Sequence, residues 1–175
     1  MGVSLIRKTR GTKIMKMIFS RQQKLYPMPS KKTMNRMVEE LCRICGLLES
    51  NPFFRLAINF VDTATICQLN KDFVGHEGST DVISFNYSTD KDSSNDDIDG
   101  ELFICTDTAE SAAKRLNRKF SEEIALYIVH GILHISGEDD STVSERRRMR
   151  CLERKIIAKL VKSFNFSEIF PERSN

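Results

Sequence analysis

The chain has 175 residues, of which 40% are hydrophobic, and it carries a formal net charge of +3 at pH 7. This length and apolar content suit one compact domain with its own core and are too small for two domains of ordinary size. No apolar run approaches the roughly 18–20 residues of a membrane-spanning helix, so we expect a soluble protein without a membrane partner.

The charge is distributed unevenly along the chain. Residues 1–38 contain ten of the 27 Lys and Arg residues and no acid. We interpret residues 1–12 as a basic, flexible N-terminal arm, residues 13–165 as one metal-dependent hydrolase-like domain and residues 166–175 as a C-terminal tail. A basic arm suits a polyanionic partner, although a solvated leader explains it equally well. The arm has few serines and the five cysteines are scattered, which favours a cytoplasmic protein over the organellar alternative.

Hydrophobic periodicity predicts the elements in chain order, beginning with an edge strand at Ile14–Phe19. A helix with apolar residues at every third or fourth position starts behind Ser30 and ends at Gly46. Alternation at Phe54–Phe60 then predicts a half-buried strand, and Asp62 caps a short helix that runs to about Lys71.

The second half of the chain reads as two more strands followed by three helices. The strands are expected at Asp81–Tyr87 and Asp99–Cys105, separated by a polar, acidic segment. The helices are expected at Asp107–Asn117, Ser121–Ser136 and Val143–Phe164. This order predicts an α+β fold: a single domain with a small mixed β-sheet and surrounding helices. The helix that begins at Ser121 is apolar nearly all round, so we expect it to run centrally through the core.

The central helix carries two histidines one turn apart. His130 and His134 share a helix face because they stand four residues apart. Gly137 permits a left-handed turn after the helix, so that Asp139 or Asp140 could meet a metal held by the two imidazoles. This is the layout of a zinc site with three protein ligands and an open position. Two buried histidines satisfied by their neighbours are the alternative interpretation.

The signature around the histidines, His130-Gly131-x-Leu133-His134-x-x-Gly137-x-Asp139, is one of four informative blocks. The others are Leu69-Asn70 with Phe73 and Thr80–Phe85, Asp99–Ile104, and Met149-Arg150-x-Leu152-Glu153. Together, over about residues 54–160, they resemble in content and order the YbeY family, the metal-dependent endoribonucleases of ribosomal RNA maturation.

The resemblance implies one Zn²⁺ per chain at a catalytic site built on His130 and His134. Asp140 stands where the family has a third histidine, so we assign His130, His134 and Asp140 as the metal ligands and Asp139 as a supporting residue or alternative ligand. Candidate substrate contacts are His76, Ser84, Arg115, Arg118 and Arg146, of which the arginines could hold phosphates.

The implied function is that of a zinc-dependent single-strand endoribonuclease in ribosomal RNA processing, maturation and quality control of the small ribosomal subunit. The resemblance also implies partners among small-subunit ribosomal proteins and the Era GTPase. Val74 stands where the family has an arginine, which predicts reduced activity. A non-catalytic ribosome-assembly or RNA-binding protein that keeps the fold and the metal is the alternative. A metallopeptidase is less favoured, because H-E-x-x-H requires a glutamate where this chain has Gly131.

Overall fold

The computed structural model describes residues 16–23, 25–88 and 98–172. The predicted basic arm and most of the polar segment before Asp99 lie outside the described residues. Among the described residues the elements are β1 (Lys16–Arg21), α1 (Lys31–Ile44), α2 (Leu47–Ser50), β2 (Arg55–Val61), α3 (Thr63–Leu69), the π-helical turn η1 (Asn70–Val74), β3 (Val82–Asn86), β4 (Gly100–Cys105), α4 (Thr106–Leu116), α5 (Phe120–Ile135), α6 (Val143–Leu160) and α7 (Phe166–Ile169).

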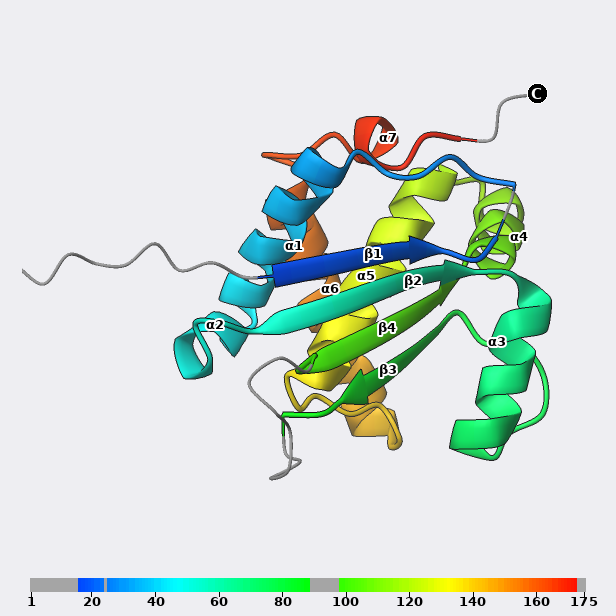
Figure 1. Cartoon of the computed structure of the whole chain (residues 1–175), viewed down its shortest axis with the longest axis horizontal. Helices are drawn as coiled ribbons and strands as arrows, with labels where there is room; N and C mark the ends of the chain where they lie inside the picture. The colour runs from blue at the N-terminus through cyan, green and yellow to red at the C-terminus, as the bar shows by residue number, and fades with distance from the viewer. Residues whose placement is uncertain (1–15, 24, 89–97, 173–175) are drawn as a thin grey trace, which may run out of the picture.

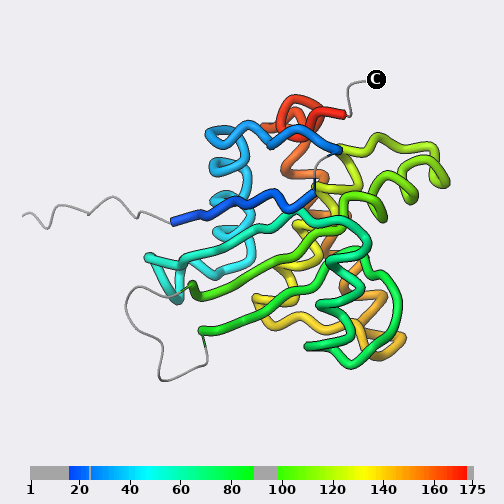
Figure 2. The backbone as a smooth tube through the Cα atoms, turned by 45° about the vertical axis from the view of Figure 1, so that its right-hand side comes forward, coloured from blue at the N-terminus to red at the C-terminus, as the bar shows by residue number. Residues whose placement is uncertain are grey.

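The four strands form one mixed sheet in the order β1-β2-β4-β3. β1, β2 and β4 are parallel to one another, whereas β3 pairs antiparallel with β4 and forms an edge of the sheet. Helices α1, α5 and α6 lie behind this sheet in Figure 1, and the turned view of Figure 2 shows the same two layers from another side. The predicted α+β class with a small mixed sheet is therefore confirmed.

α5 is the central helix because its sequence is apolar on almost every face. Ile124, Ile128, Val129 and Ile132 are at most 1% exposed, and they share one core with the inward residues of the strands. Burying a side chain of this size stabilises the fold by about 1.5–3 kcal/mol. This helix packs directly on β3 and β4, which places its histidines beside the edge strand.

Gly131 is the point of closest approach between α5 and the sheet. A Cβ atom at this position would lie 2.7 Å from Leu102 Cδ2 and 3.2 Å from Val82 Cγ2. The side chains of β3 and β4 therefore occupy the space that any larger residue would need. The absence of a side chain at Gly131 thus lets the sheet approach α5 next to the histidines.

The packed domain continues past the expected boundary at residue 165. Phe166, Ile169 and Phe170 are buried in the main core, and the Ser30 N–H donates to the Ile169 carbonyl at 3.2 Å. α7 accordingly lies beside the start of α1 in Figure 1. Among the described helices, none combines the length and the apolar character that a bilayer crossing requires.

Candidate metal centre

The two histidines of α5 lie side by side, half-buried, with their Nε2 atoms 3.0 Å apart. Their rings are nearly perpendicular, and the ring centroids lie 4.5 Å apart. The spacing follows from the helix, because residues i and i+4 stack one turn above each other on one face.

Each imidazole is held through its other ring nitrogen. His130 Nδ1 lies 2.7 Å from Glu153 Oε1 of α6, and His134 Nδ1 lies 3.0 Å from the Glu138 carbonyl oxygen. A carbonyl oxygen can only accept, so Nδ1 of His134 carries the proton, and the carboxylate of Glu153 favours the same tautomer in His130. Both Nε2 atoms then present lone pairs, which repel at 3.0 Å unless a proton or a metal cation lies between them.

The chain returns to the histidines through a turn at Gly137, whose φ of 100° favours glycine. The Gly137 N–H donates to the His134 carbonyl and the Glu138 N–H to the Leu133 carbonyl, each at 3.0 Å. The turn brings the Asp140 carboxylate to 3.9 Å from His130 Nε2 and 3.8 Å from His134 Nε2.

Two arginines at the start of α6 tie this loop in place. Arg146 Nη1 donates to the Asp140 carbonyl at 3.0 Å and to the Ser141 carbonyl at 2.6 Å. Arg148 pairs with the Glu138 carboxylate at 2.7 Å. The Thr142 capping box, with Glu145 N–H donating to Thr142 Oγ1 at 3.2 Å, fixes the start of the same helix. The position of Asp140 is therefore set by several independent contacts.

Asp139 faces the loop itself. Its Oδ1 accepts hydrogen bonds from the Asp140 N–H at 2.7 Å and from Ser141 Oγ at 2.9 Å. These hydrogen bonds favour the charged form and lower the pKa of Asp139. Its visible role is to shape the turn that delivers Asp140.

The donor set fits a divalent metal. Among the described residues, His130, His134 and Asp140 each offer one ligand atom, and these atoms lie within 4.8 Å of one another. Ligands bound to zinc at about 2.0–2.2 Å lie roughly 3.3 Å apart in a tetrahedron, so small side-chain rotations would bring Asp140 into place. Two neutral imidazoles with anchored Nδ1 atoms and one carboxylate are the donors that zinc prefers.

The electrostatics of the site also favour a cation. Burial lowers the pKa of His130, but the hydrogen bond to Glu153 and the negative charges of Asp81, Glu153 and Asp140 outweigh it, so the pKa is raised. The same carboxylates that retain a proton on the imidazole would stabilise a metal ion bound there.

A hollow opens beside His134, between β3 and the segment that follows η1. It is lined by Asn70, Val74, His76, Ser79, Thr80, Val82, Ile83, Ser84, Asn86, His134 and Ile135. The Asn86 amide donates to the Ile135 carbonyl at 2.9 Å and so ties β3 to the end of α5. The hollow gives a substrate access to His134, and no lysine or arginine is among its described lining residues.

The model of the family "Endoribonuclease YbeY" matches residues 18–161. The chain belongs to this family. A relative of that name from Elusimicrobium minutum is 39% identical over 101 residues, which cover 58% of this chain and 71% of the relative. Another from Protochlamydia amoebophila is 46% identical over 83 residues, covering 47% of this chain and 55% of the relative.

A solved structure agrees with the fold. The solution structure of a Thermotoga maritima protein matches with a TM-score of 0.55 at 22% identity, and the match covers 83% of this chain and 89% of that one. At this identity the match shows a shared fold alone. The predicted family and the hydrolase class are confirmed by the family match, whereas the zinc ion and the individual site residues stay predictions.

The structure brings together some of the expected site residues of this YbeY family member and not others. His76 and Ser84 line the same hollow as His134. Arg115 is exposed on α4 and Arg118 pairs with buried Glu123 at 3.2 Å, and neither lines the hollow. Arg146 lies at the site, with one of its nitrogens already engaged by the metal loop.

Sequence reasoning missed the residue that orients His130. Glu153 lies in the closing block of the family resemblance, but it is 23 positions from His130. The sequence feature that could have identified Glu153 is a glutamate on the buried side of an otherwise basic helix. The contact between His134 and the Glu138 carbonyl involves a backbone atom, so no residue type in the sequence indicates it.

Removing the Asp140 carboxylate is expected to weaken metal binding more than removing that of Asp139. Asp140→Ala should lower zinc affinity by at least about 100-fold, because it deletes a ligand, whereas outer contacts typically contribute 10–100-fold. Asp139→Ala should have a smaller effect through the turn. Titration against a competing chelator measures both, and a larger loss for Asp139→Ala would reverse the assignment.

Neutralising Glu153 is expected to lower zinc affinity by about 10–100-fold. Glu153→Gln keeps an acceptor for His130 Nδ1 but removes the charge, so Glu153→Leu should cost more than Glu153→Gln. Glu49→Gln, at an exposed position of α2, is the matched control for loss of one acid. Equal affinities in all three variants would show that Glu153 has no part in the site.

Proposed function

We propose that this protein is a zinc-dependent endoribonuclease that cuts single-stranded RNA during ribosomal RNA processing, maturation and quality control of the small ribosomal subunit. One observation supports this above all others: two anchored imidazoles and a loop carboxylate converge, and one of these imidazoles, that of His134, lines an accessible hollow. Membership of the YbeY endoribonuclease family supplies the reaction and the substrate class.

The residues of the site would have three different roles: binding the metal, orienting the imidazoles and contacting the RNA. His130, His134 and Asp140 would hold one zinc ion, which when bound lowers the pKa of water toward 7 and polarises a phosphoryl oxygen. Glu153 and the Glu138 carbonyl keep both imidazoles in the binding tautomer. The Ser84 hydroxyl and the exposed His76 imidazole can donate hydrogen bonds to an RNA backbone in the hollow.

The charge of the hollow suggests a slow enzyme. Phosphoryl transfer gains most from preorganised positive charge at the phosphate, and the described lining residues include neither lysine nor arginine. Val74, 46% exposed, lines this hollow at the position where the family has its arginine. We therefore expect cleavage well below the rate that an arginine at this position would give.

The same observation favours a second candidate, a ribosome-assembly or RNA-binding protein that keeps the metal but does not cut.

A metallopeptidase is not supported, because its general base would stand at position 131. The Cβ position of Gly131 meets Leu102 and Val82 of the sheet, so a glutamate there would be buried in the core rather than placed at the metal. Ribosomal-protein and Era GTPase partners rest on the resemblance, and the cytoplasmic location rests on the composition of the chain.

The protein is expected to cut a single-stranded RNA slowly when it is supplied with zinc and not after treatment with a chelator. A duplex of the same sequence should resist, because the proposed activity is on single-stranded RNA. His134→Ala, purified in parallel, controls for contaminating nucleases. Equal cleavage by that variant would remove the evidence for this site, and a silent wild type with zinc bound would favour the non-catalytic candidate.

A further inference from the structure

A second hollow lies on the other side of the metal centre, between α5 and α6. It is lined by Arg118, Glu122, Glu123, Leu126, Arg147, Arg150, Glu153, Arg154, Ile157, Ala158, Val161 and Phe166. Glu153 is thus in its wall, whereas neither metal-binding histidine is among the lining residues. We call this hollow the α5–α6 groove; apart from Glu153, its lining residues have no part in the function proposed above.

One row of side chains on α6 gives the groove its character. Arg147, Arg150, Arg154, Ile157 and Val161 follow one another at spacings of three, four, three and four residues. This 3-4-3-4 spacing is that of a helix seam that packs against another helix. Val161 is 52% exposed and the three arginines are exposed, whereas Ile157 is half-buried, so the described helices leave most of the seam open to solvent.

The two halves of the seam differ in chemistry. The first half presents three guanidinium groups over about 10 Å of helix, at 1.5 Å per residue. The second half presents Ile157 and Val161, next to Leu126 of α5. A partner that matches both halves carries acids at one end of a helix face and apolar residues at the other.

The acids of the groove are already engaged within the protein. Glu123 accepts from Arg118 at 3.2 Å, Glu153 contacts His130 at 2.7 Å and Glu122 accepts from the Lys119 N–H at 3.4 Å. By contrast, the side chains of Arg147 and Arg150 form no hydrogen bond or ion pair with a described residue. Arg154 uses only its Nε, which donates to the Arg150 carbonyl at 3.1 Å. The lining thus holds four arginines and three glutamates, and three of the arginines, Arg147, Arg150 and Arg154, pair with no carboxylate of the described residues and remain available to a ligand.

We propose that the α5–α6 groove binds an amphipathic, acidic helix of a protein partner. Glu or Asp residues on one half of the partner's contact face pair with Arg147, Arg150 and Arg154. Apolar residues on the other half cover Leu126, Ile157 and Val161. This is the helix-in-groove mode of recognition, with charge setting the position of the helix and apolar burial supplying affinity.

The chemistry of the groove favours a protein helix over RNA. Single-stranded RNA is held by phosphate contacts together with aromatic faces on which bases stack. The exposed apolar surface here is aliphatic, and Phe166, the aromatic residue of the lining, is only 5% exposed. Aliphatic side chains at heptad spacing match the side chains of a second helix instead.

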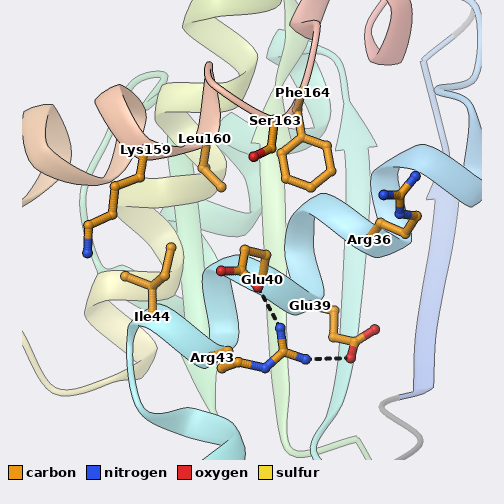
Figure 3. Close-up of a pocket in the computed structure, with 9 residues that line it drawn as sticks. All are labelled: Arg36, Glu39, Glu40, Arg43, Ile44, Lys159, Leu160, Ser163 and Phe164. Carbon is orange, nitrogen blue, oxygen red and sulfur yellow. Dashed lines mark hydrogen bonds and ion pairs between the residues drawn. The ribbon is translucent and has the colours of Figure 1, made fainter.

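A neighbouring hollow supplies a control surface of similar charge. It lies between α1 and the end of α6, and Figure 3 shows Arg36, Arg43 and Lys159 among its lining residues. Arg43 is paired with Glu39 at 2.8 Å and with Glu40 at 2.5 Å, so this surface is largely matched within the chain. Removing basic residues here changes the net charge without touching the seam.

The test uses the full chain and fluorescent peptides of about three heptads. The probe carries glutamates at the contact positions of one half and leucines at those of the other, and a second peptide of the same composition has these residues moved to the opposite face. Arg147→Ala/Arg150→Ala/Arg154→Ala is compared with Arg36→Ala/Arg43→Ala/Lys159→Ala, which removes the same charge from the control surface. Val161→Glu tests the apolar half, and thermal melts check folding.

The probe should bind better than its rearranged counterpart. The groove triple variant should lower the affinity for the probe by about tenfold or more, whereas the control triple variant should lower it by less than about twofold. Val161→Glu should also lower this affinity. Equal binding of the two peptides, or equal losses in the two triple variants, would overturn the proposal. If the groove triple variant lost affinity for a single-stranded oligoribonucleotide instead of the peptide, the groove would be an RNA surface and the proposal would be wrong.

Discussion

Val74→Arg is expected to raise the single-turnover rate of RNA cleavage by about 10²–10³, the usual value of one preorganised donor at a developing charge. Val74 ends η1, lines the hollow with His134 and is 46% exposed, so a longer side chain can reach the hollow from solvent. RNA affinity should change little, because the new interaction acts mainly in the transition state. Rates and affinities measured separately distinguish the two effects.

The control for added charge is Val161→Arg, at a similarly exposed valine outside the hollow. It should leave the rate constant unchanged. Asp140→His should add to the gain from Val74→Arg, because replacing the carboxylate with a neutral ligand raises the net positive charge of the site. A wild type as fast as the double variant would indicate that another residue, His76 first, already performs the arginine's task.

His134→Ala is expected to abolish zinc binding and to lower the melting temperature of the zinc-loaded protein. A ligand at 100 times its Kd stabilises the folded state by about 2.7 kcal/mol, which corresponds to roughly 5–10 °C for a chain of this size. His76→Ala is the matched control, since His76 is exposed and stands outside the donor set. Thermal melts with and without chelator measure the effect.

Chelation should narrow the difference in melting temperature between the wild type and His134→Ala, because only the wild type then loses a bound metal ion. A difference that persists unchanged in chelator would assign the effect to the packing of His134 rather than to metal. Elemental analysis that finds no transition metal in the wild type, with no uptake on titration, would contradict the assigned site.

The parts of the site that the sequence predicted are those set by local geometry. His130 and His134 share a face because of the helical period, and Gly137 permits the turn because it has no Cβ. Each of these depends on residues within a few positions of one another. The prediction of the central helix had the same basis, since nearly every face of α5 is apolar.

The parts that the sequence could not predict depend on contacts between distant segments. Glu153 reaches His130 only because α6 packs on α5. The run Arg146–Arg148 divides for a similar reason: Arg146 and Arg148 hold the metal loop, while Arg147 points into the α5–α6 groove. A run of like charges carries no sign of this division, because it follows from where the loop returns after Gly137.

The end of the domain was misplaced for a related reason. Residues 166–170 form too short an apolar segment to predict an element from periodicity, yet Phe166 and Phe170 complete the core beside α1 and α5. Their burial depends on the tertiary position of α1, whose N-cap residue Ser30 donates its N–H to the Ile169 carbonyl.

The most direct test of the account is to titrate zinc into metal-free protein while measuring both bound zinc and single-turnover cleavage of a single-stranded RNA. We predict that cleavage rises in proportion to occupancy, reaches its limit at one zinc ion per chain and is absent from His134→Ala. Cleavage at full rate without metal, or by His134→Ala, would contradict the account. A Val74→Arg/Asp140→His variant that is fully loaded with zinc and still cuts no RNA would also contradict the account.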